Sequence, residues 1–351
     1  MLARVRATVA TQLRPRVRDI DAGTYPVEVL RDLGAAGAFA PLQARAPDLS
    51  TAIDAMAIVG AECLATAFCV WCQDALLWYV ANSANDTLKD NFQPLIASGE
   101  ILGGTGLSNP MKALSGIEPL RLKGTRVAGG WRVNGLLPWV SNLGESHLFG
   151  ICFARESDPT QLIMALARCG DDGVTTQQNA HFIALEGTAT VSVAFRDAFI
   201  PDAMVLADPA ASFIQRIRTG FILLQTGMAL GLVNGSTALM RECDLGGNGV
   251  NVHLPDRPDE LQDLAARLTE TVRVLARTPD ETGTDYLRAV LQVRLNGSEL
   301  ALTAAQSLML HAGARGYIAG SAASRKLREA YFVAIVTPAI KHLRKDIAAL
   351  R

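Results

Sequence analysis

The spacing of the hydrophobic residues changes twice along this 351-residue chain, and this change constrains the fold more than any single motif. Up to about residue 99 the apolar residues recur at helical spacing, as in Val29, Leu30 and Leu33. After Gly103 they alternate in short segments bounded by Gly, Pro and Asn, which is typical of strands. Beyond Asp208 the helical spacing returns. The chain is therefore predicted to be an α+β protein with helices at both ends.

The same changes set the predicted domain boundaries. We expect an N-terminal helical domain over residues 1–102, a β domain over 103–208 and a C-terminal helical bundle over 209–351. In the β domain, Gly129-Gly130 separates two alternating segments, and glycine tolerates the positive φ of a two-residue hairpin turn. Repeated short strands predict a small β-barrel or sandwich. The Gly-, Asn- and Pro-rich stretch 244–258 is predicted to be a loop between helices.

Charge and apolar content limit the possible partners. The chain has 33 basic and 34 acidic side chains, so its net charge of −1 argues against a protein that grips the phosphates of nucleic acid. The most apolar runs, 68–80 and 221–233, are each interrupted by polar residues, whereas a membrane span needs roughly 20 apolar residues. We therefore expect no nucleic acid, no membrane and a small-molecule ligand.

The six cysteines are sparse and lack the paired spacing of a zinc site. They predict reduced core thiols in a cytoplasmic protein, with no metal. Cys69 and Cys72 have the spacing of a redox motif, but they lie in an apolar helical run without a preceding strand. Packing in the core is the favoured interpretation for both.

Two segments of the β region carry flat and hydrogen-bonding groups. The segment 136–142 contains Trp139 and ends in Ser141 and Asn142, and the segment 103–110 is rich in glycine and hydroxyl groups. A flat indole beside such groups suits a flat ligand with polar edges, and together they suggest a flavin site. A Rossmann dinucleotide site is not expected, because no helix follows the glycines within a βαβ unit and Pro110 comes too soon.

These segments belong to a wider pattern that resembles the acyl-CoA dehydrogenase family over nearly the whole chain, with gaps. Residues 139–142, Trp-Val-Ser-Asn, are similar to the family's Trp-Ile-Thr-Asn segment. Residues 129–135 are similar to its β hairpin, and residues 195–201 match the segment that closes its β domain. The resemblance implies a helical, β-barrel, helical fold. It also implies FAD, with the isoalloxazine ring between the β domain and the C-terminal helices.

The resemblance implies a role for each matching residue. Trp139 would pack against the flavin, and the Ser141 hydroxyl would hydrogen-bond near the reactive N5 edge of the ring. Ser108 would contact the pyrimidine edge, and the backbone amides of Gly106 and Leu107 would supply further donors.

Three other matches extend the implied site. Gly313 and Gly316 resemble a turn that lies against the FAD of a neighbouring subunit, which implies a homodimer or homotetramer. The same turn also reads as a helix C-cap, and both interpretations can hold. Ser115 is the residue that could meet a phosphate or pantetheine of the substrate. The family's signature for the FAD pyrophosphate has only a distant counterpart at residues 241–247.

The position of the catalytic base departs from the family pattern. Counted without gaps from Arg328-Glu329-Ala330, the glutamate that takes the α-proton of the acyl thioester falls on Thr337. A threonine hydroxyl cannot act as a base near neutral pH. Some members carry the glutamate on the first long C-terminal helix, but residues 224–229 contain no carboxylate. The catalytic residue is therefore unknown from the sequence.

Four other titratable side chains lie in or near matching segments. His311 and His342 are more often packed or surface residues than bases, and ion pairing is the favoured interpretation of Glu329. Glu100 is a carboxylate close to the glycine segment.

Three functions stay open. The first is a flavin-dependent dehydrogenase that moves a hydride from an acyl thioester or similar substrate to flavin N5, with an electron-transfer partner or oxygen as acceptor. The second is a flavin-dependent monooxygenase on the same fold, for which the missing base is no obstacle because a peroxyflavin requires a dry, shaped pocket. The third is a ligand-binding protein that has lost both FAD and catalysis. The first is preferred, because the glycine segment, the tryptophan and the hairpin all remain.

Overall fold

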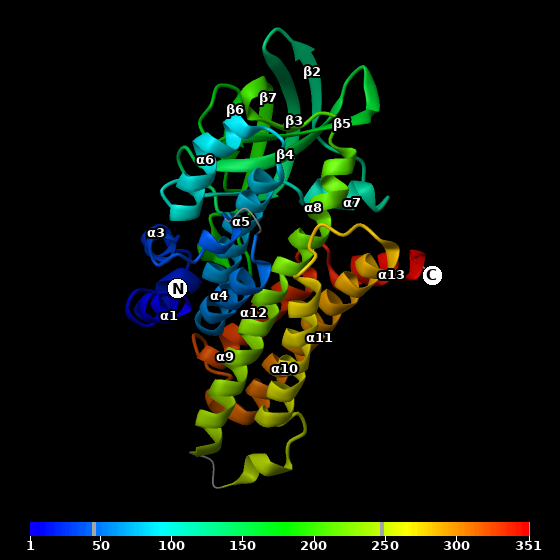
Figure 1. Cartoon of the computed structure of the whole chain (residues 1–351). Coiled ribbons are helices and arrows are strands. Elements are labelled where there is room, and N and C mark those ends of the chain that lie inside the picture. The colour runs from blue at the N-terminus through cyan, green and yellow to red at the C-terminus, as the bar shows by residue number, and fades with distance from the viewer. Residues whose placement is uncertain (44–46, 246–248, 351) are drawn as a thin grey trace.

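The protein has a β-sheet at one end and a bundle of long helices at the other, with N-terminal helices packed along both (Figure 1). The computed structural model describes residues 1–43, 47–245 and 249–350. The predicted order of helices, strands and helices is confirmed. The exact domain boundaries stay a prediction.

Helices make up the N-terminal part. Asp48 precedes α4, and its side chain accepts a hydrogen bond from the amide of Thr51 at 3.1 Å, which satisfies one of the free amides of the helix start. The helices are α1 (Leu2–Thr8), α2 (Val17–Asp21), α3 (Val27–Ala35), α4 (Leu49–Glu62), α5 (Leu64–Asn82) and α6 (Asp86–Ser98), with single π or 3₁₀ turns at Val9–Leu13, Arg14–Arg16 and Ala40–Leu42.

Helix α5 is the central helix of the molecule and is buried along nearly its whole length. Gln73, which interrupts its apolar run, connects it to the strands: the side-chain amide donates to Ile96 O and Ile101 O, and its oxygen accepts from Gly103 N at 2.9 Å. Cys69 and Cys72 are both buried there as free thiols. Burial raises the pKa of both thiols well above the ordinary value, which agrees with packing rather than redox chemistry.

One mixed sheet forms the β region, with the strand order β6-β7-β3-β2-β4-β5-β8 and with β1 parallel to β4. The strands are β1 (Gly103–Thr105), β2 (Lys123–Val127), β3 (Gly130–Val140), β4 (Leu148–Arg155), β5 (Asp158–Arg168), β6 (Val174–Gln177), β7 (Val191–Pro201) and β8 (Val205–Ala207). The hairpin turn between β2 and β3 consists of Ala128 and Gly129, one residue before the predicted pair, and Gly129 has φ +76°.

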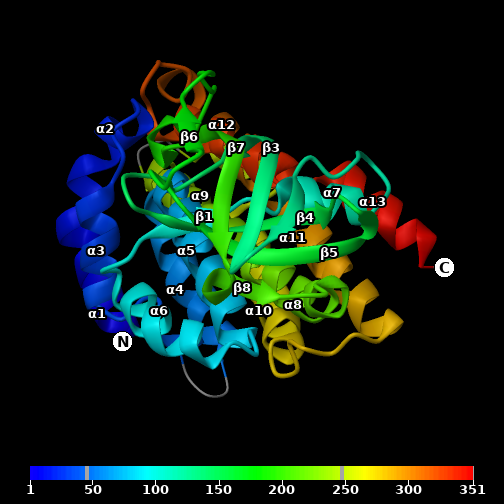
Figure 2. The ribbon, with the colours of Figure 1, turned by 90° about the horizontal axis from the view of Figure 1, so that it is seen from above.

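The sheet curves around a core of its own but does not close. That core includes Trp131, Phe149, Phe153 and Phe195, while Leu148 and Leu166 belong to the larger core around α5. Among the described strands, the end strands β6 and β8 pair on one side only. The expected closed barrel or two-sheet sandwich is therefore corrected to an open, curved sheet, whose second face is covered by helices (Figure 2).

The C-terminal part is a helical bundle. Its helices are α8 (Ala211–Leu224), α9 (Thr226–Leu245), α10 (Pro258–Leu275), α11 (Thr284–Ala312), α12 (Ala322–Ile335) and α13 (Ile340–Ala349). Helix α9 packs closely against α4, where a Cβ at Gly231 would lie only 2.7 Å from Ala57 O. The predicted loop 244–258 begins later than expected, since α9 continues to Leu245 and a 3₁₀ turn spans Val250–His253. Residues 246–248 of that loop, and of the 241–247 motif, lie outside the described residues.

Two helical stretches, Leu64–Asn82 and Ala211–Leu245, are long and apolar enough by composition to cross a membrane. In the folded chain 94% and 83% of their most apolar windows are buried inside the protein. This burial is typical of the core helices of a globular protein. The absence of a membrane partner stays a prediction.

Candidate functional site

The two segments that the sequence singles out lie side by side. Asn142 Nδ2 donates to Gly103 O at 2.6 Å, and Asn142 Oδ1 accepts from the Tyr25 hydroxyl at 2.7 Å. A Cβ at Gly104 would lie 2.1 Å from Ser141 O, so only glycine fits at this crossing. The glycine segment and the tryptophan segment therefore form one wall, as their shared character suggested.

A bulge in β3 turns Trp139 outward. The register of β3 against β7 shifts between Leu137 and Val140, so that Pro138 and Trp139 stand opposite a single β7 residue. Proline has no N–H to donate to the ladder, and a bulge redirects the side chain next to it. Trp139 is 46% exposed, while Leu137 and Val140 are buried. One side of the indole contacts Phe182, at 5.5 Å between ring centroids.

Ser141 is held by a row of hydroxyl groups. Its Oγ lies 2.6 Å from Thr190 Oγ1, which lies 2.8 Å from Thr188 Oγ1. Thr188 donates to Leu185 O at 2.7 Å, which fixes the direction of the row. Thr190 therefore donates to Thr188 and Ser141 donates to Thr190, and because a hydroxyl has only one hydrogen, Ser141 can serve a further partner only as an acceptor. The bulge and this row hold Trp139 and Ser141 in defined positions.

The backbone donors expected at Gly106 and Leu107 are already used within the chain. The Gly106 amide donates to Gly150 O at 2.7 Å, and the Leu107 amide donates to Thr105 Oγ1 at 3.2 Å. Their predicted role as free donors to a flavin is therefore wrong for this structure. A short helix does follow the glycines, since α7 (Ser108–Leu114) begins two residues after Gly106. Pro110 lies in its first turn, where a proline costs no hydrogen bond.

Thr337 lies at the centre of a hydrogen-bond network that sequence reasoning missed. Its Oγ1 lies 2.9 Å from Ser108 Oγ, and its carbonyl oxygen accepts from Gln225 Nε2 at 2.8 Å. Gln225 Oε1 accepts in turn from Arg294 Nε at 2.7 Å. Gln225 interrupts a long helix, because it separates α8 from α9. Thr337 is thus hydrogen-bonded to Gln225, which lies in the stretch 224–229 where the resemblance gives the second place for a catalytic glutamate, and both residues carry hydroxyl or amide groups instead of a carboxylate.

Arg294 on α11 is fully buried beneath this network. Its Nη2 donates to Val333 O at 2.8 Å, and its Nη1 donates to Ser298 Oγ. Burial lowers the pKa of Arg294 to about 10, so the guanidinium is still charged at neutral pH. The sequence does contain a signal for it, which is a single arginine within an apolar helical stretch: Val290, Leu291, Val293 and Leu295.

Ser115 lies at the end of α7 and contacts α13. Figure 2 shows α7 beside α13. Its Oγ donates to Asp346 Oδ2 at 3.0 Å and lies 2.7 Å from His342 Nε2, and Arg218 Nη2 also donates to Asp346 Oδ2 at 2.6 Å. Burial raises the pKa of Asp346, but the hydrogen bonds from His342 and Ser115 and the charge of Arg218 outweigh it and lower the pKa overall. Ser115 therefore joins two helices, and its contact with a substrate stays a prediction.

His342 is placed in this cluster in a way that does not match a Ser-His-Asp triad. Asp346 Oδ2 lies 3.3 Å from His342 Nε2, the same ring nitrogen that contacts Ser115. A triad requires the carboxylate on the opposite nitrogen. Nucleophilic catalysis by Ser115 is therefore not supported by the geometry.

Gly313 ends α11 in a tight turn, as the C-cap interpretation predicted. It has φ +55°, and a Cβ there would meet no atom within 4 Å, while Gly316 lies against Ala312. Contact of Gly313 and Gly316 with a FAD across subunits stays a prediction. His311, on the last turn of α11, is buried with Nδ1 3.0 Å from Ser307 O. It is 17 residues from Arg294 along one helix, a distance of about 25 Å, so it is remote from the Thr337 network.

Glu329 forms ion pairs, as favoured from the sequence. Its Oε1 lies 3.0 Å from Arg325 Nη1, and its Oε2 lies 3.3 Å from Lys326 Nζ, with all three side chains buried. We call these three residues the Glu329 cluster. Glu100 is exposed in the turn before β1 and belongs to none of these networks.

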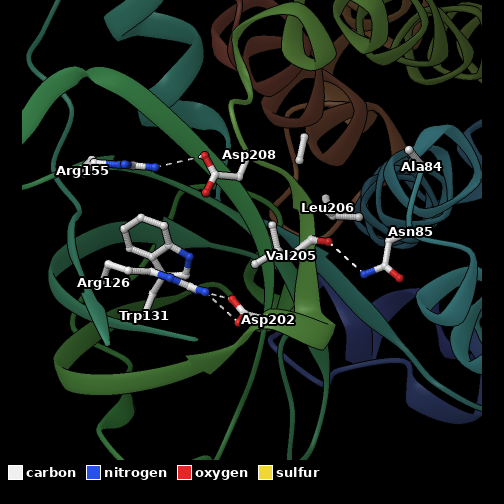
Figure 3. A pocket seen from close by; sticks show the side chains of 10 residues that line it. Ala84, Asn85, Arg126, Trp131, Arg155, Asp202, Val205, Leu206 and Asp208 are labelled. Atoms are coloured by element: carbon white, nitrogen blue, oxygen red, sulfur yellow. Dashed lines mark hydrogen bonds and ion pairs between the residues drawn. The ribbon is translucent and has the colours of Figure 1, made fainter. Parts of the chain in front are cut away.

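A surface hollow of about 520 Å³ lies elsewhere, between the sheet and the start of α6 (Figure 3). Arg126 and Arg155 lie over the Trp131 ring, at 5.4 and 5.2 Å from its centroid. Arg126 pairs with Asp202, and Arg155 lies 3.4 Å from Asp208. Each arginine already has its own acid, and none of the predicted site residues lines this hollow.

The exposed residues around Trp139 fit a flavin in chemical character. An exposed indole face suits a flat ring, the Ser141 oxygen suits a donor at its edge, and the Ser108–Thr337 pair has one free hydroxyl hydrogen for an acceptor. Among the described residues, no group of three or more His, Cys, Asp or Glu side chains is arranged to hold a metal ion.

This fold defines the class of protein. Over 100% of this chain and 97% of the other, it matches the butyryl-CoA dehydrogenase of Megasphaera elsdenii with a TM-score of 0.86 at 16% identity. A dibenzothiophene monooxygenase from Paenibacillus sp. A11-2 matches with a TM-score of 0.83 at 15% identity, over 99% of this chain and 95% of the other. A glutaryl-CoA dehydrogenase of Mycobacterium smegmatis, in complex with FADH2, has a TM-score of 0.77 at 18% identity over 99% and 92%.

Curated sequences give the family. No protein-family model matches the sequence. The benzylmalonyl-CoA dehydrogenase of Aromatoleum aromaticum is 29% identical over 33% of this chain and 30% of its own length. The "Probable acyl-CoA dehydrogenase YngJ" of Bacillus subtilis is 23% identical over 92% of this chain and 90% of its own. The first of these matches covers less than a third of that relative, whereas the second is nearly full-length. The chain belongs to the acyl-CoA dehydrogenase family, a family of flavoprotein oxidoreductases.

Proposed function

We propose that this protein binds FAD against the exposed face of Trp139 and transfers a hydride from an acyl thioester or a similar substrate to flavin N5. One observation carries the proposal: the glycine segment, the tryptophan segment and Thr337 form a continuous wall where the sequence pattern would put the ring. A bound flavin would accept the hydride and pass the electrons to a further acceptor.

The residues of the wall have separate tasks in this proposal. Trp139 supports the ring through its exposed face, and the bulge in β3 keeps that face outward. Ser141 donates to Thr190, so its oxygen would accept a hydrogen bond at one edge of the ring. Ser108 lies at another edge, held by Thr337. The proton acceptor is left unassigned, because neither Thr337 nor Gln225 can act as a base.

A monooxygenase is the second candidate, and the missing carboxylate favours it. Removal of an α-proton from an acyl thioester needs a base, whereas oxygen transfer needs a pocket that excludes water. The fold similarity to a dibenzothiophene monooxygenase is compatible with this alternative. A protein that has lost its flavin is the third possibility.

An absorbance spectrum of the purified protein, with mass analysis of the released ligand, separates the first two functions from the third. Anaerobic bleaching of the flavin by an acyl-CoA would support the dehydrogenase. Oxygen consumption that requires both reduced flavin and a substrate would support the monooxygenase. A protein that is purified without flavin, and that binds neither FAD nor FMN on titration, would overturn both.

Two variants locate the flavin. Trp139→Ala should weaken FAD binding by roughly tenfold or more, because a stacked aromatic contact contributes about 1–3 kcal/mol per ring. Phe199→Ala is the matched control, since Phe199 is an exposed aromatic residue on β7 that belongs to none of the site networks. Equal FAD affinity in both variants would show that Trp139 is not the ring support.

We also propose a cytoplasmic homodimer or homotetramer that completes its FAD site near Gly313 and Gly316 between subunits. The open space beside Gly313 supports this assembly. Sedimentation of the purified protein at several concentrations tests it. A monomer that retains tightly bound FAD would contradict it.

A further inference from the structure

A buried cation without an acidic partner lies directly behind the proposed site. All three nitrogens of Arg294 donate hydrogen bonds, but the acceptors on Gln225, Ser298 and Val333 are neutral. Among the described residues, no carboxylate oxygen lies within 4.0 Å of this guanidinium. A fully buried charge is unfavourable unless opposite charge compensates it. The fold itself offers only partial compensation.

That partial compensation comes from a helix end. Val333 lies in the last turn of α12, where unpaired carbonyls amount to about half a negative charge. The remaining charge has no counterpart near Arg294 in the described chain. The positive potential of Arg294 therefore extends to the site through Gln225 and Thr337, which lie between the guanidinium and the site.

Gln225 carries this polarity toward Thr337. A guanidinium can only donate hydrogen bonds, so the amide oxygen of Gln225 must face Arg294 and the amide nitrogen must face away. That nitrogen donates to Thr337 O, and because Gln225 is fully buried it acts on the accessible end only through Thr337. The Ser108 and Thr337 hydroxyls share a single hydrogen bond, which leaves one hydroxyl hydrogen available. Ser108 and Thr337 are both partly exposed, so the accessible end of the network can donate to a ligand.

We propose that this end of the site binds a carboxylate group of the ligand, with the free hydroxyl hydrogen of the Ser108–Thr337 pair as donor and with Gln225 and Arg294 as the polar and charged groups behind it. The position where the family's pattern would have a carboxylate base would then receive a carboxylate from the substrate. This inference rests on the proposed function only in assigning the ligand to the same pocket. It narrows the substrate class to acids, or to acyl compounds with a second, free carboxylate.

The test compares benzoate with its neutral isostere benzamide, by calorimetric titration of the purified full-length protein. Benzoate should bind at least roughly tenfold more tightly, since a hydrogen bond to a charged group is worth more than one to a neutral group. Equal affinities in the wild-type protein would overturn the inference.

Three variants assign the preference to this network. Gln225→Glu would supply Arg294 with an acid and should remove the preference for benzoate, whereas Arg294→Lys keeps the charge and should retain part of it. Arg126→Gln, in the hollow beside Trp131, should leave the preference unchanged, because Arg126 is already paired with Asp202. A preference that persists in Gln225→Glu, or that disappears in Arg126→Gln, would contradict the inference.

The absorbance spectrum of the same samples separates the two proposals. Flavin-containing protein that does not distinguish benzoate from benzamide would refute the carboxylate site and leave the flavin proposal intact. Flavin-free protein that binds benzoate preferentially, and loses the preference in Gln225→Glu, would refute the flavin proposal while the carboxylate site stands.

Discussion

Two buried sites in this protein contain cationic side chains, and they differ in whether an acid contacts the cation. In the Glu329 cluster, Arg325 and Lys326 share one carboxylate. In the second group, Arg294 contacts only neutral acceptors. Each cation of the first group contacts an acid of the fold, whereas Arg294 contacts none among the described residues. This difference distinguishes a structural charge cluster from one that is available to a ligand.

The Glu329 cluster joins two helices. Lys326 Nζ donates to Gly60 O and Arg325 Nη1 donates to Glu62 O, both at the C-terminal end of α4. Glu329 Oε1 accepts from the amide of Leu64, the first residue of α5, at 3.2 Å. Cations at a helix C-terminus and an anion at an N-terminus both match the helix dipoles. The cluster thereby fixes the sharp connection between the two central helices of the N-terminal part.

Removing the shared acid should have the largest effect. Glu329→Gln leaves Arg325 and Lys326 buried without compensation, so we expect a loss of about 3–5 kcal/mol in the free energy of unfolding. Urea denaturation measures it. Glu62→Gln is the control, because Glu62 pairs with an exposed Arg14 and its loss should change the free energy by at most about 1 kcal/mol. Similar values for both variants would show that Glu329 does not compensate the buried charges of Arg325 and Lys326.

Asp74 is the opposite case, a buried acid without a cation. Neither of its oxygens has a hydrogen-bond partner among the described residues, and burial raises its pKa well above the ordinary 3.8. The folded state therefore holds a proton that the unfolded chain releases above about pH 4. Stability should fall as pH rises from there toward the folded pKa, by about 1.4 kcal/mol per pH unit.

The substitution Asp74→Asn removes this titration and should flatten the dependence of stability on pH. Urea denaturation of both proteins at pH 5, 6 and 7 measures the two slopes. The variant should gain stability relative to the wild type as pH increases. Parallel slopes would mean that Asp74 has a partner or is ionised in the folded state.

Supplying an acid to the second group should make it resemble the first. Gln225→Glu places a carboxylate at the end of the Arg294 guanidinium, but its second oxygen faces Thr337 O with no hydrogen to donate. Gln225→Leu is the matched control, because it lacks both the acceptor for Arg294 Nε and the donor to Thr337 O. We expect Gln225→Glu to be about 1–2 kcal/mol more stable than Gln225→Leu at neutral pH, since the cation is already desolvated. Thermal unfolding of both variants tests this. Equal stability of the two variants would argue that Arg294 is already compensated.

The sequence predicted the fold better than the site. Changes of hydrophobic period identified the helical, strand and helical regions, because burial on one face imposes that period. Closure of the sheet was mispredicted, since it depends on whether β6 meets β8 and not on any local pattern. Likewise, the sequence did not predict that the amides of Gly106 and Leu107 donate to Gly150 and Thr105, because these bonds depend on the folded backbone.

Within the site, local features were predictable and long-range partners were not. Trp139 and the glycine segment stand out in the sequence because aromatic and glycine residues are unusual beside hydroxyls. Arg294 and Gln225 are 69 positions apart, so their contact depends on the packing of α11 against the α8–α9 break. A lone arginine in an apolar helix shows that a partner is needed but does not identify it.

The smallest effect is expected in the cluster of Ser115, His342, Asp346 and Arg218, in which Ser115 joins α7 to α13. Ser115→Ala removes hydrogen bonds to Asp346 and His342, but Arg218 still compensates Asp346, so no charge is left unpaired. We therefore expect a loss of only about 1 kcal/mol in the free energy of unfolding, in contrast to Glu329→Gln. Asp346→Asn, measured in parallel, should destabilise the protein near pH 7 and lose its effect in acid. The lowered pKa of Asp346 contributes stability that is present above about pH 4 and disappears as pH falls through the folded pKa. If Ser115→Ala destabilised as much as Glu329→Gln, then the number of hydrogen bonds, and not charge compensation, would set the strength of these clusters.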